Sequence, residues 1–202
     1  MKPVHAVWIG LLLTAVQGAA QVSIRLDAMM PSAAQLGGGW TSNHVVVLLD
    51  PLSQPNEVCN EGAGWLEAAH NVVSKGGCNS YCVSRYFWQG SGWFLVWSKR
   101  YESEGDIGDG WGKDYDGWGK EKKPEHSLDN LPKVGTEVRF YQRHGMHNNI
   151  AFRRGKFVFD VEGPSTPQHI PQLKELAEAI DKRLVKALAD RNGEGPAAEN
   201  QK

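Results

Sequence analysis

The sequence predicts an α+β fold, an antiparallel sheet packed against two amphipathic helices, with one long loop rich in Trp, Gly and Asp. Runs of aromatic and β-branched residues recur along the chain and alternate with short turn sequences, which indicates strands joined by hairpins. Two other segments, near residues 58–73 and 173–188, have apolar residues at helical spacing. Consecutive strands flanked by helices are typical of a sheet with helices packed on it.

The clearest strand signal is a hairpin in the middle of the chain. Residues 81–88 and 93–101 are aromatic and β-branched, and the QGSG link between them is rich in turn residues. An earlier apolar run, residues 45–49, stops at an Asp-Pro pair, which favours a buried strand. Three later strands are predicted at residues 134–141, 150–153 and 156–161.

The last of these strands has two faces of different chemistry. Phe157, Phe159 and Val161 fall on one face, and Asp160 and Glu162 fall on the other, because successive strand residues point to opposite sides. The sequence therefore predicts that one face of this strand is apolar and that the other carries carboxylates.

The two helices are predicted from their apolar stripes. The first runs from Val58 to Val73 and ends at the glycine pair 76–77. The second follows the proline-rich link 163–171 and places a stripe of Leu, Ile and Ala on one side between Leu173 and Leu188.

Both ends of the chain are predicted to lie outside the folded domain. Residues 1–20 contain Lys2, the apolar run AVWIGLLLTAV and small residues, an order typical of a secretory signal peptide cleaved after Ala20. A membrane anchor is the alternative, but this run is much shorter than the roughly 20 apolar residues that cross a bilayer. Residues 21–190 are predicted as a single domain and residues 191–202 as a disordered tail. The mature protein is expected in the periplasm or outside the cell, without a membrane span.

Charge and composition narrow the classes of partner. The chain has 22 basic and 23 acidic residues, a formal net charge of −1. Because no basic stripe is present to neutralise phosphates, nucleic-acid binding is not expected. The eight Trp residues do not decide between packing and binding, since Trp is common in cores and at interfaces.

The predicted export determines the expected oxidation state of the cysteines. In an oxidising compartment at least two of Cys59, Cys78 and Cys82 are expected to form a disulfide. A helix after Cys59 followed by a returning strand would bring Cys82 back towards Cys59, so we predict the Cys59–Cys82 disulfide. A Cys78–Cys82 bridge would instead require a turn between those residues, because the Cα atoms of a disulfide lie only about 5.5 Å apart.

The least ordinary segment is the long loop, which repeats Asp-Gly-Trp-Gly-Lys at residues 109–113 and 116–120. Glycines on both sides of each Trp free the backbone and let the indole project. The prediction is a binding site for a protein or a sugar, formed by Trp111, Trp118, Asp109 and Asp116. The alternatives are a solvated loop whose tryptophans fold back on the sheet and a Ca²⁺ loop, although the EF-hand order of acids is absent.

Other residue groups do not match a catalytic or metal motif. His144 and His147 are conceivable zinc ligands together with cysteine thiols, but their spacing is not a known zinc pattern and reads more simply as a turn. Ser91 lies in Gly-Ser-Gly between two strands, whereas a nucleophile elbow lies between a strand and a helix. The paired arginines 153 and 154 indicate a solvated turn or, alternatively, an anion clamp. No catalytic residue, metal ligand or cofactor is predicted.

The last third of the chain carries a resemblance. IAFRRGKFVFDVEG followed by LKELAEAIDKRL resembles the ending of uncharacterised secreted bacterial domains, in which a strand, an RRG turn, a second strand and a helix recur. The similarity covers residues 148–184. It implies a small sandwich of sheet and helix that binds partners, and it supplies no catalytic residues.

These observations lead to an expected function and its alternatives. We expect an exported, non-enzymatic binding or accessory domain that holds a protein or an envelope or extracellular ligand through the Trp-rich loop. The first alternative is a hydrolase that acts on an envelope polymer with carboxylates of that loop. The second is an accessory subunit that uses the exposed edge of its sheet.

Overall fold

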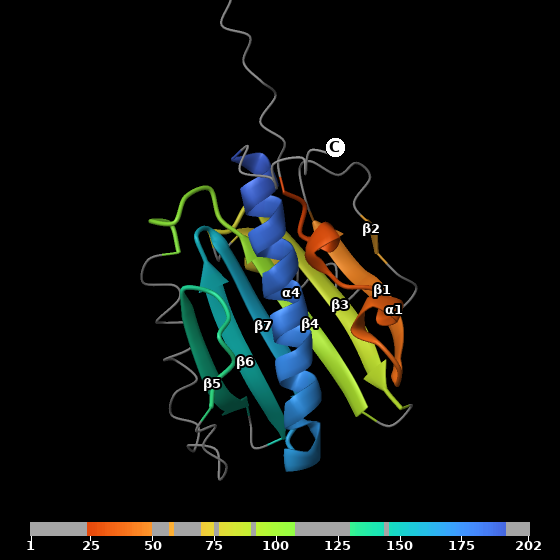
Figure 1. Cartoon of the computed structure of the whole chain (residues 1–202). Coiled ribbons are helices and arrows are strands. Elements are labelled where there is room, and N and C mark those ends of the chain that lie inside the picture. The colour runs from red at the N-terminus through yellow and green to blue at the C-terminus, as the bar shows by residue number, and fades with distance from the viewer. Residues whose placement is uncertain are drawn as a thin grey trace, which may run out of the picture.

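The predicted α+β fold is confirmed by a computed structural model, in which a seven-stranded antiparallel sheet packs against a long C-terminal helix (Figure 1). The structure describes residues 24–49, 57–58, 70–74, 77–89, 92–107, 130–143 and 146–192 of the chain. Among these residues, no helix is long and apolar enough to cross a membrane.

The sheet consists of two antiparallel halves that meet in its middle. The strand order is β2-β1-β3-β4-β7-β6-β5, so β4 and β7, which are distant in sequence, are neighbours. All neighbouring strands are antiparallel. The strands are β1 (Trp40–Leu49), β2 (Glu57–Val58), β3 (Ser80–Trp88), β4 (Gly92–Arg100), β5 (Glu137–Arg143), β6 (His147–Arg154) and β7 (Phe157–Pro164).

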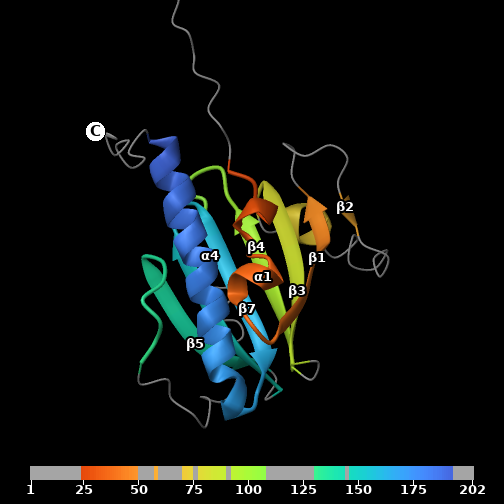
Figure 2. The same ribbon diagram turned by 45° about the vertical axis from the view of Figure 1, so that its right-hand side comes forward.

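Helices lie on both sides of this sheet. The long helix α4 (Ile170–Arg191) crosses one face, and the short helix α1 (Ala33–Leu36) lies on the same side, beside β1 (Figures 1 and 2). Two turns of 3-10 helix, η1 (Asp27–Met29) and η2 (Pro167–His169), precede α1 and α4. Residues 70–74 are also helical, and Val72 and Val73 pack against clusters on the other face of the sheet.

The main core lies between the sheet and α4, on what we call the α4 face. Alternate residues of the central strands point into it, and the rings of Phe152 and Phe159 stack with their centroids 5.2 Å apart. Gly163 is required by this close packing, since a Cβ there would lie 2.7 Å from the Phe94 ring. The buried residues that α4 contributes are Leu173, Leu176, Ala177, Ile180, Asp181 and Leu184.

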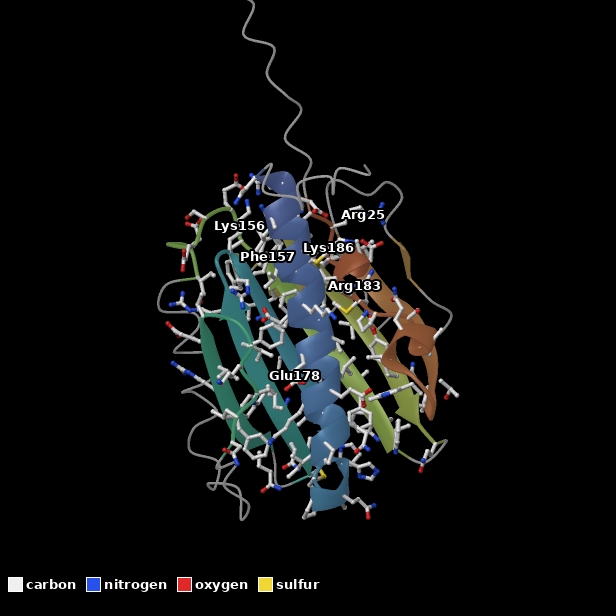
Figure 3. The ribbon with its side chains drawn as sticks, in the orientation of Figure 1. Arg25, Lys156, Phe157, Glu178, Arg183 and Lys186 are labelled. Atoms are coloured by element: carbon white, nitrogen blue, oxygen red, sulfur yellow. The ribbon has the colours of Figure 1, made fainter. Side chains whose placement is uncertain are left out.

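A partly buried ion pair and a surface contact fix α4 on this face. Arg154 donates from Nε and Nη2 to the two carboxylate oxygens of Asp181, each at 2.8 Å. Further along, Arg183 extends from α4 towards the segment before β1 and donates to the Ala28 carbonyl at 2.9 Å (Figure 3). Glu178 and Lys186, also labelled there, are exposed. The helix is therefore held by polar contacts at its margins as well as by its apolar stripe.

Two local expectations need correction. Val58 was predicted to begin the first helix, but it pairs with Val47 as part of β2. Apolar spacing is shared by buried strands and helices, and an antiparallel neighbour supplies the backbone partners that decide between them. The strand predicted at residues 45–49 is also longer than its apolar run, because β1 begins at Trp40, opposite Trp88.

Candidate functional site

The predicted loop site lies outside the described residues, which include none of Trp111, Trp118, Asp109 and Asp116. The residues on either side of this segment are placed. Ile107 is fully buried on the sheet face opposite α4, which we call the far face, in a cluster that contains Ala151 and Val158. On the other side of the segment, the carbonyl oxygen of Asn130 accepts a hydrogen bond from Lys174 of α4. Ile107, the last described residue before the segment, thus lies on the far face.

Cys78 and Cys82 lie on different sides of the sheet. Cys82 points into the α4-face core and Cys78 into a far-face cluster, and no disulfide joins the two. Because Cys82 lies inside β3, the turn that such a bridge requires is not present. Cys59 is outside the described residues, so the Cys59–Cys82 disulfide stays a prediction.

Five polar residues converge on one half of the far face, and we call them the polar cluster: Tyr141, His147, Asn149, Asp160 and Glu162. They come from the adjacent strands β5, β6 and β7. Asn149 is opposite both Tyr141 and Glu162 in the strand register, so these side chains share one face. Asn149 is fully buried, and Asp160 and Glu162 are also buried.

Asp160 is the hydrogen-bonding centre of this cluster. Its Oδ1 accepts from Nδ2 of Asn149 at 3.0 Å, and its Oδ2 accepts a short hydrogen bond from the hydroxyl of Tyr141. A buried carboxylate is stable only if such donors replace the water it has lost. Asp160 therefore fixes the positions of Tyr141 and Asn149, two residues that belong to different strands.

Two tryptophans of β4 border the polar cluster. Trp97 is directly opposite Asp160 in the β4–β7 register, where facing Cβ atoms lie about 5 Å apart. Trp93 contacts the His147 ring with centroids 5.0 Å apart and an interplanar angle of 58°. Both indoles and the Tyr141 and His147 rings are half-buried. The cluster thus combines buried carboxylates and a buried amide with four neighbouring rings that keep part of their surface exposed.

Some buried polar atoms here have no hydrogen-bond partner among the described residues. They include Oδ1 of Asn149 and Nδ1 of His147, both in the polar cluster. A buried acceptor or donor without a partner costs roughly 1–3 kcal/mol, so native proteins keep few of them. Polar atoms with unused hydrogen-bonding capacity beside aromatic rings are typical of a ligand-binding site.

The paired arginines of the β6–β7 hairpin are not a clamp for an anion. Neighbouring strand residues point to opposite faces, so Arg154 reaches Asp181 of α4 while Arg153 turns to the far face. There Arg153 forms an ion pair with Glu137 of β5 and lies 3.9 Å from Glu104. The hydrogen bonds to Glu137 and Asp181 raise the pKa of Arg153 and of Arg154, respectively. Both guanidinium groups have carboxylate partners.

In the described part of the chain, no arrangement of side chains supports the zinc or the Ca²⁺ alternative. No group of three or more His, Cys, Asp or Glu side chains is placed there to hold a metal ion. His144 and the acids of the Trp-rich segment lie outside that part. His147, which the sequence placed in a turn or a zinc site, is instead the first residue of β6 and contacts Trp93.

Sequence reasoning identified part of this site. The alternation of β7 correctly placed Asp160 and Glu162 opposite its apolar residues. It did not identify Tyr141, Asn149 or Trp97 as their neighbours, because these residues come from strands whose order in the sheet is not encoded locally. The only available signal was the alternation of polar and apolar residues along each strand.

Comparisons with family models, curated proteins and solved structures gave no match for this chain.

Proposed function

We propose that this chain is an exported, non-enzymatic binding domain, and that its ligand is held against the far face together with the Trp-rich segment that follows Ile107. The observation that carries the proposal is the polar cluster bordered by Trp93 and Trp97. The rings of Trp93 and Trp97 on the central strand β4 present contact area at little entropic cost, and the buried polar groups beside them supply fixed hydrogen-bonding groups.

The chemistry of this surface suits a glycan. Indole faces stack on the C–H faces of sugar rings, while carboxylate, amide and imidazole groups match neighbouring hydroxyls. The Asn149 Oδ1 and His147 Nδ1 atoms provide hydrogen-bonding capacity that the described residues leave unused. We therefore infer that the ligand is a polysaccharide of an envelope or of the extracellular space.

A binding assay with defined polysaccharides tests this proposal. The protein would be pelleted with insoluble peptidoglycan, chitin and cellulose, and titrated with soluble oligosaccharides of those that retain it. We expect Trp97→Ala to weaken binding about tenfold or more, which corresponds to about 1.4 kcal/mol. Val185→Ala is the matched control, since Val185 is an exposed apolar residue of α4, on the opposite side of the sheet. Equal binding by the two variants, or no binding to any glycan, contradicts the proposal.

The contribution of the Trp-rich segment is separable from that of the sheet. If Trp111 and Trp118 project outwards for the ligand, changing both to Ala leaves the free energy of unfolding nearly unchanged and weakens binding. If they are packed in the core, each change costs about 3–5 kcal/mol. Thermal melts of the double variant distinguish the two outcomes, and a large loss of stability contradicts the role of this segment in binding.

One observation favours a hydrolase as the second candidate. Asp160 and Glu162 are two residues apart on one face of β7, about 6.6 Å between Cα atoms at the usual strand rise, and glycosidases use paired carboxylates at about 5–9.5 Å. Incubation of the same polysaccharides with the wild type, Glu162→Gln and Asp160→Asn checks for released reducing ends. Hydrolysis by the wild type that both variants lose would replace the binding proposal by this one.

A further inference from the structure

The two tryptophans that border the polar cluster belong to the same strand. Trp93 and Trp97 are four residues apart in β4, so both indoles lie on the far face. The registers of β4 with β3 and with β7 run without a bulge, which keeps the strand regular between them. At the usual strand rise the two Cα atoms are about 13 Å apart, the length of roughly three sugar rings in an extended chain. The strand thus sets a fixed spacing between two stacking surfaces.

Each indole has a second ring beside it from another strand. Trp93 contacts His147 of β6, with ring centroids 5.0 Å apart. Trp97 contacts Tyr81 of β3, with ring centroids 6.3 Å apart and an interplanar angle of 40°. Tyr81 is buried, whereas both indoles keep part of their surface exposed. Because neighbouring rings already support the indoles, a ligand orders little side-chain freedom when it stacks on them.

Hydrogen-bonding groups lie between the two indoles along the strand. Leu95, midway between them, is opposite Glu162 of β7, and Glu162 is opposite Asn149 of β6. The Asn149 amide is oriented by its donation to Asp160, and its Oδ1 has no donor among the described residues. A hydroxyl or amide N–H of a ligand supplies such a donor. The order along the site is therefore a stacking surface, a polar centre and a second stacking surface.

We propose that the ligand is an extended, linear glycan that lies along β4 and is bound through at least three consecutive sugars. One sugar stacks on Trp93 and another on Trp97, and the sugars between them lie over the polar centre. This inference rests on the proposed function, and it adds the length and the shape of the ligand. A single sugar, or a chain that coils, contacts only one indole at a time. The gain from linking the two contacts belongs to a chain that spans both.

A series of oligosaccharides tests the length and the shape with the unmodified protein. Calorimetry would use cello-oligosaccharides and chito-oligosaccharides of two to six sugars, which are extended, and malto-oligosaccharides of the same lengths, which coil. For an extended series that binds, the dissociation constant should fall about tenfold or more from the disaccharide to the tetrasaccharide and then level off. The malto-oligosaccharides should show no such gain. The extended series that binds more tightly identifies whether the sugar carries an acetamido group.

Variants of one indole test the span. Trp93→Ala should abolish the gain with length and leave the dissociation constant of the disaccharide within about twofold, because a disaccharide still stacks on Trp97. Trp93→Phe keeps a ring and should retain most of the gain. Val185→Ala, on the opposite side of the sheet, is the matched control and should bind as the wild type does. Thermal melts establish that each variant is folded.

The outcomes separate this inference from the proposed function. Binding that does not strengthen with length overturns the inference and leaves glycan binding intact. An equal gain for the malto-oligosaccharides, or a gain that persists in folded Trp93→Ala, has the same consequence. Absence of binding to every oligosaccharide and every polysaccharide contradicts the proposed function, and this inference with it.

Discussion

The two faces of the sheet are built from the same strands and yet do different things. On β7, Phe159 enters the α4-face core, while its neighbour Asp160 on the far face is hydrogen-bonded to Tyr141 and Asn149. The α4 face is closed by a helix with an apolar stripe. The far face combines small apolar clusters, which Val72 and Val73 partly cover, with buried carboxylates and half-buried rings.

This difference indicates a division of labour between stability and recognition. Apolar burial on the α4 face contributes about 25 cal/mol per Å² and is the main source of stability. Buried polar groups contribute little net free energy even when they are paired, and more often specify one arrangement. A buried polar cluster on the face of a sheet is therefore poorly explained by stability alone. Substitutions on the two faces should differ accordingly.

The largest expected effect is at Phe159, which is fully buried and stacked on Phe152. Phe159→Ala should lower the free energy of unfolding by about 3–5 kcal/mol, because it removes a large ring and leaves a cavity. Val158→Ala, the adjacent change on the far face, should cost about 1.5–2 kcal/mol for the smaller apolar group removed. Urea denaturation of both variants checks the comparison. Equal losses would mean that the far face is as much a core as the α4 face.

The next effect separates the two ion pairs of the β6–β7 hairpin. The Asp181 side chain is only 8% exposed, and that of Arg154, its partner, is 26% exposed. Asp181→Ala should cost about 1–3 kcal/mol, less than a wholly buried pair because Arg154 reaches solvent. Glu137→Ala, which removes the exposed far-face partner of Arg153, should cost less than about 1 kcal/mol. Denaturation curves that reverse this order would contradict the assignment of structural support to the α4 face.

A smaller, pH-dependent effect is expected at Tyr86, a polar group within the α4-face core. Its hydroxyl donates to the Pro31 carbonyl at 3.1 Å, and burial raises its pKa well above the ordinary value of a tyrosine. Tyr86→Phe should cost about 0.5–1.5 kcal/mol at pH 7 through the lost hydrogen bond.

The sign of the pH dependence follows from that shift. The raised pKa means that the folded state keeps Tyr86 protonated while the unfolded chain ionises it, so its contribution is complete below about pH 10 and declines at higher pH. The stability difference between the wild type and Tyr86→Phe should therefore shrink above about pH 10. Denaturation at pH 7, 9 and 11 measures it, and a difference independent of pH would show that Tyr86 ionises normally in the folded state.

The smallest effect is expected on the outer side of α4. Val185 is 43% exposed, so Val185→Lys should change the free energy of unfolding by no more than about 0.5 kcal/mol. Thermal melts and sedimentation of this variant check the prediction. A larger loss of stability, or a change in association state, would mean that the outer side of α4 is covered by a partner.

The sequence by itself determined which residues share a face. Strand alternation separated Phe159 from Asp160, and the apolar stripe from Leu173 to Leu188 predicted a helix that the structure places on the sheet as α4. These properties are local, because the geometry of one strand or one helix fixes them before any tertiary contact forms. The antiparallel sheet followed from the hairpin signals for the same reason.

Only the tertiary structure decided which strands became neighbours. The pairing of β4 with β7 brings Trp97 beside Asp160, and the position of β5 lets Tyr141 reach the same carboxylate. Strand order depends on burial and hydrogen bonding summed over the whole sheet, so no local pattern specifies it. The same balance explains why Val58, which was expected in a helix, belongs to β2 and pairs with Val47 of β1. The strands and their polar faces were thus predictable one at a time, whereas the candidate site exists only where three of them meet.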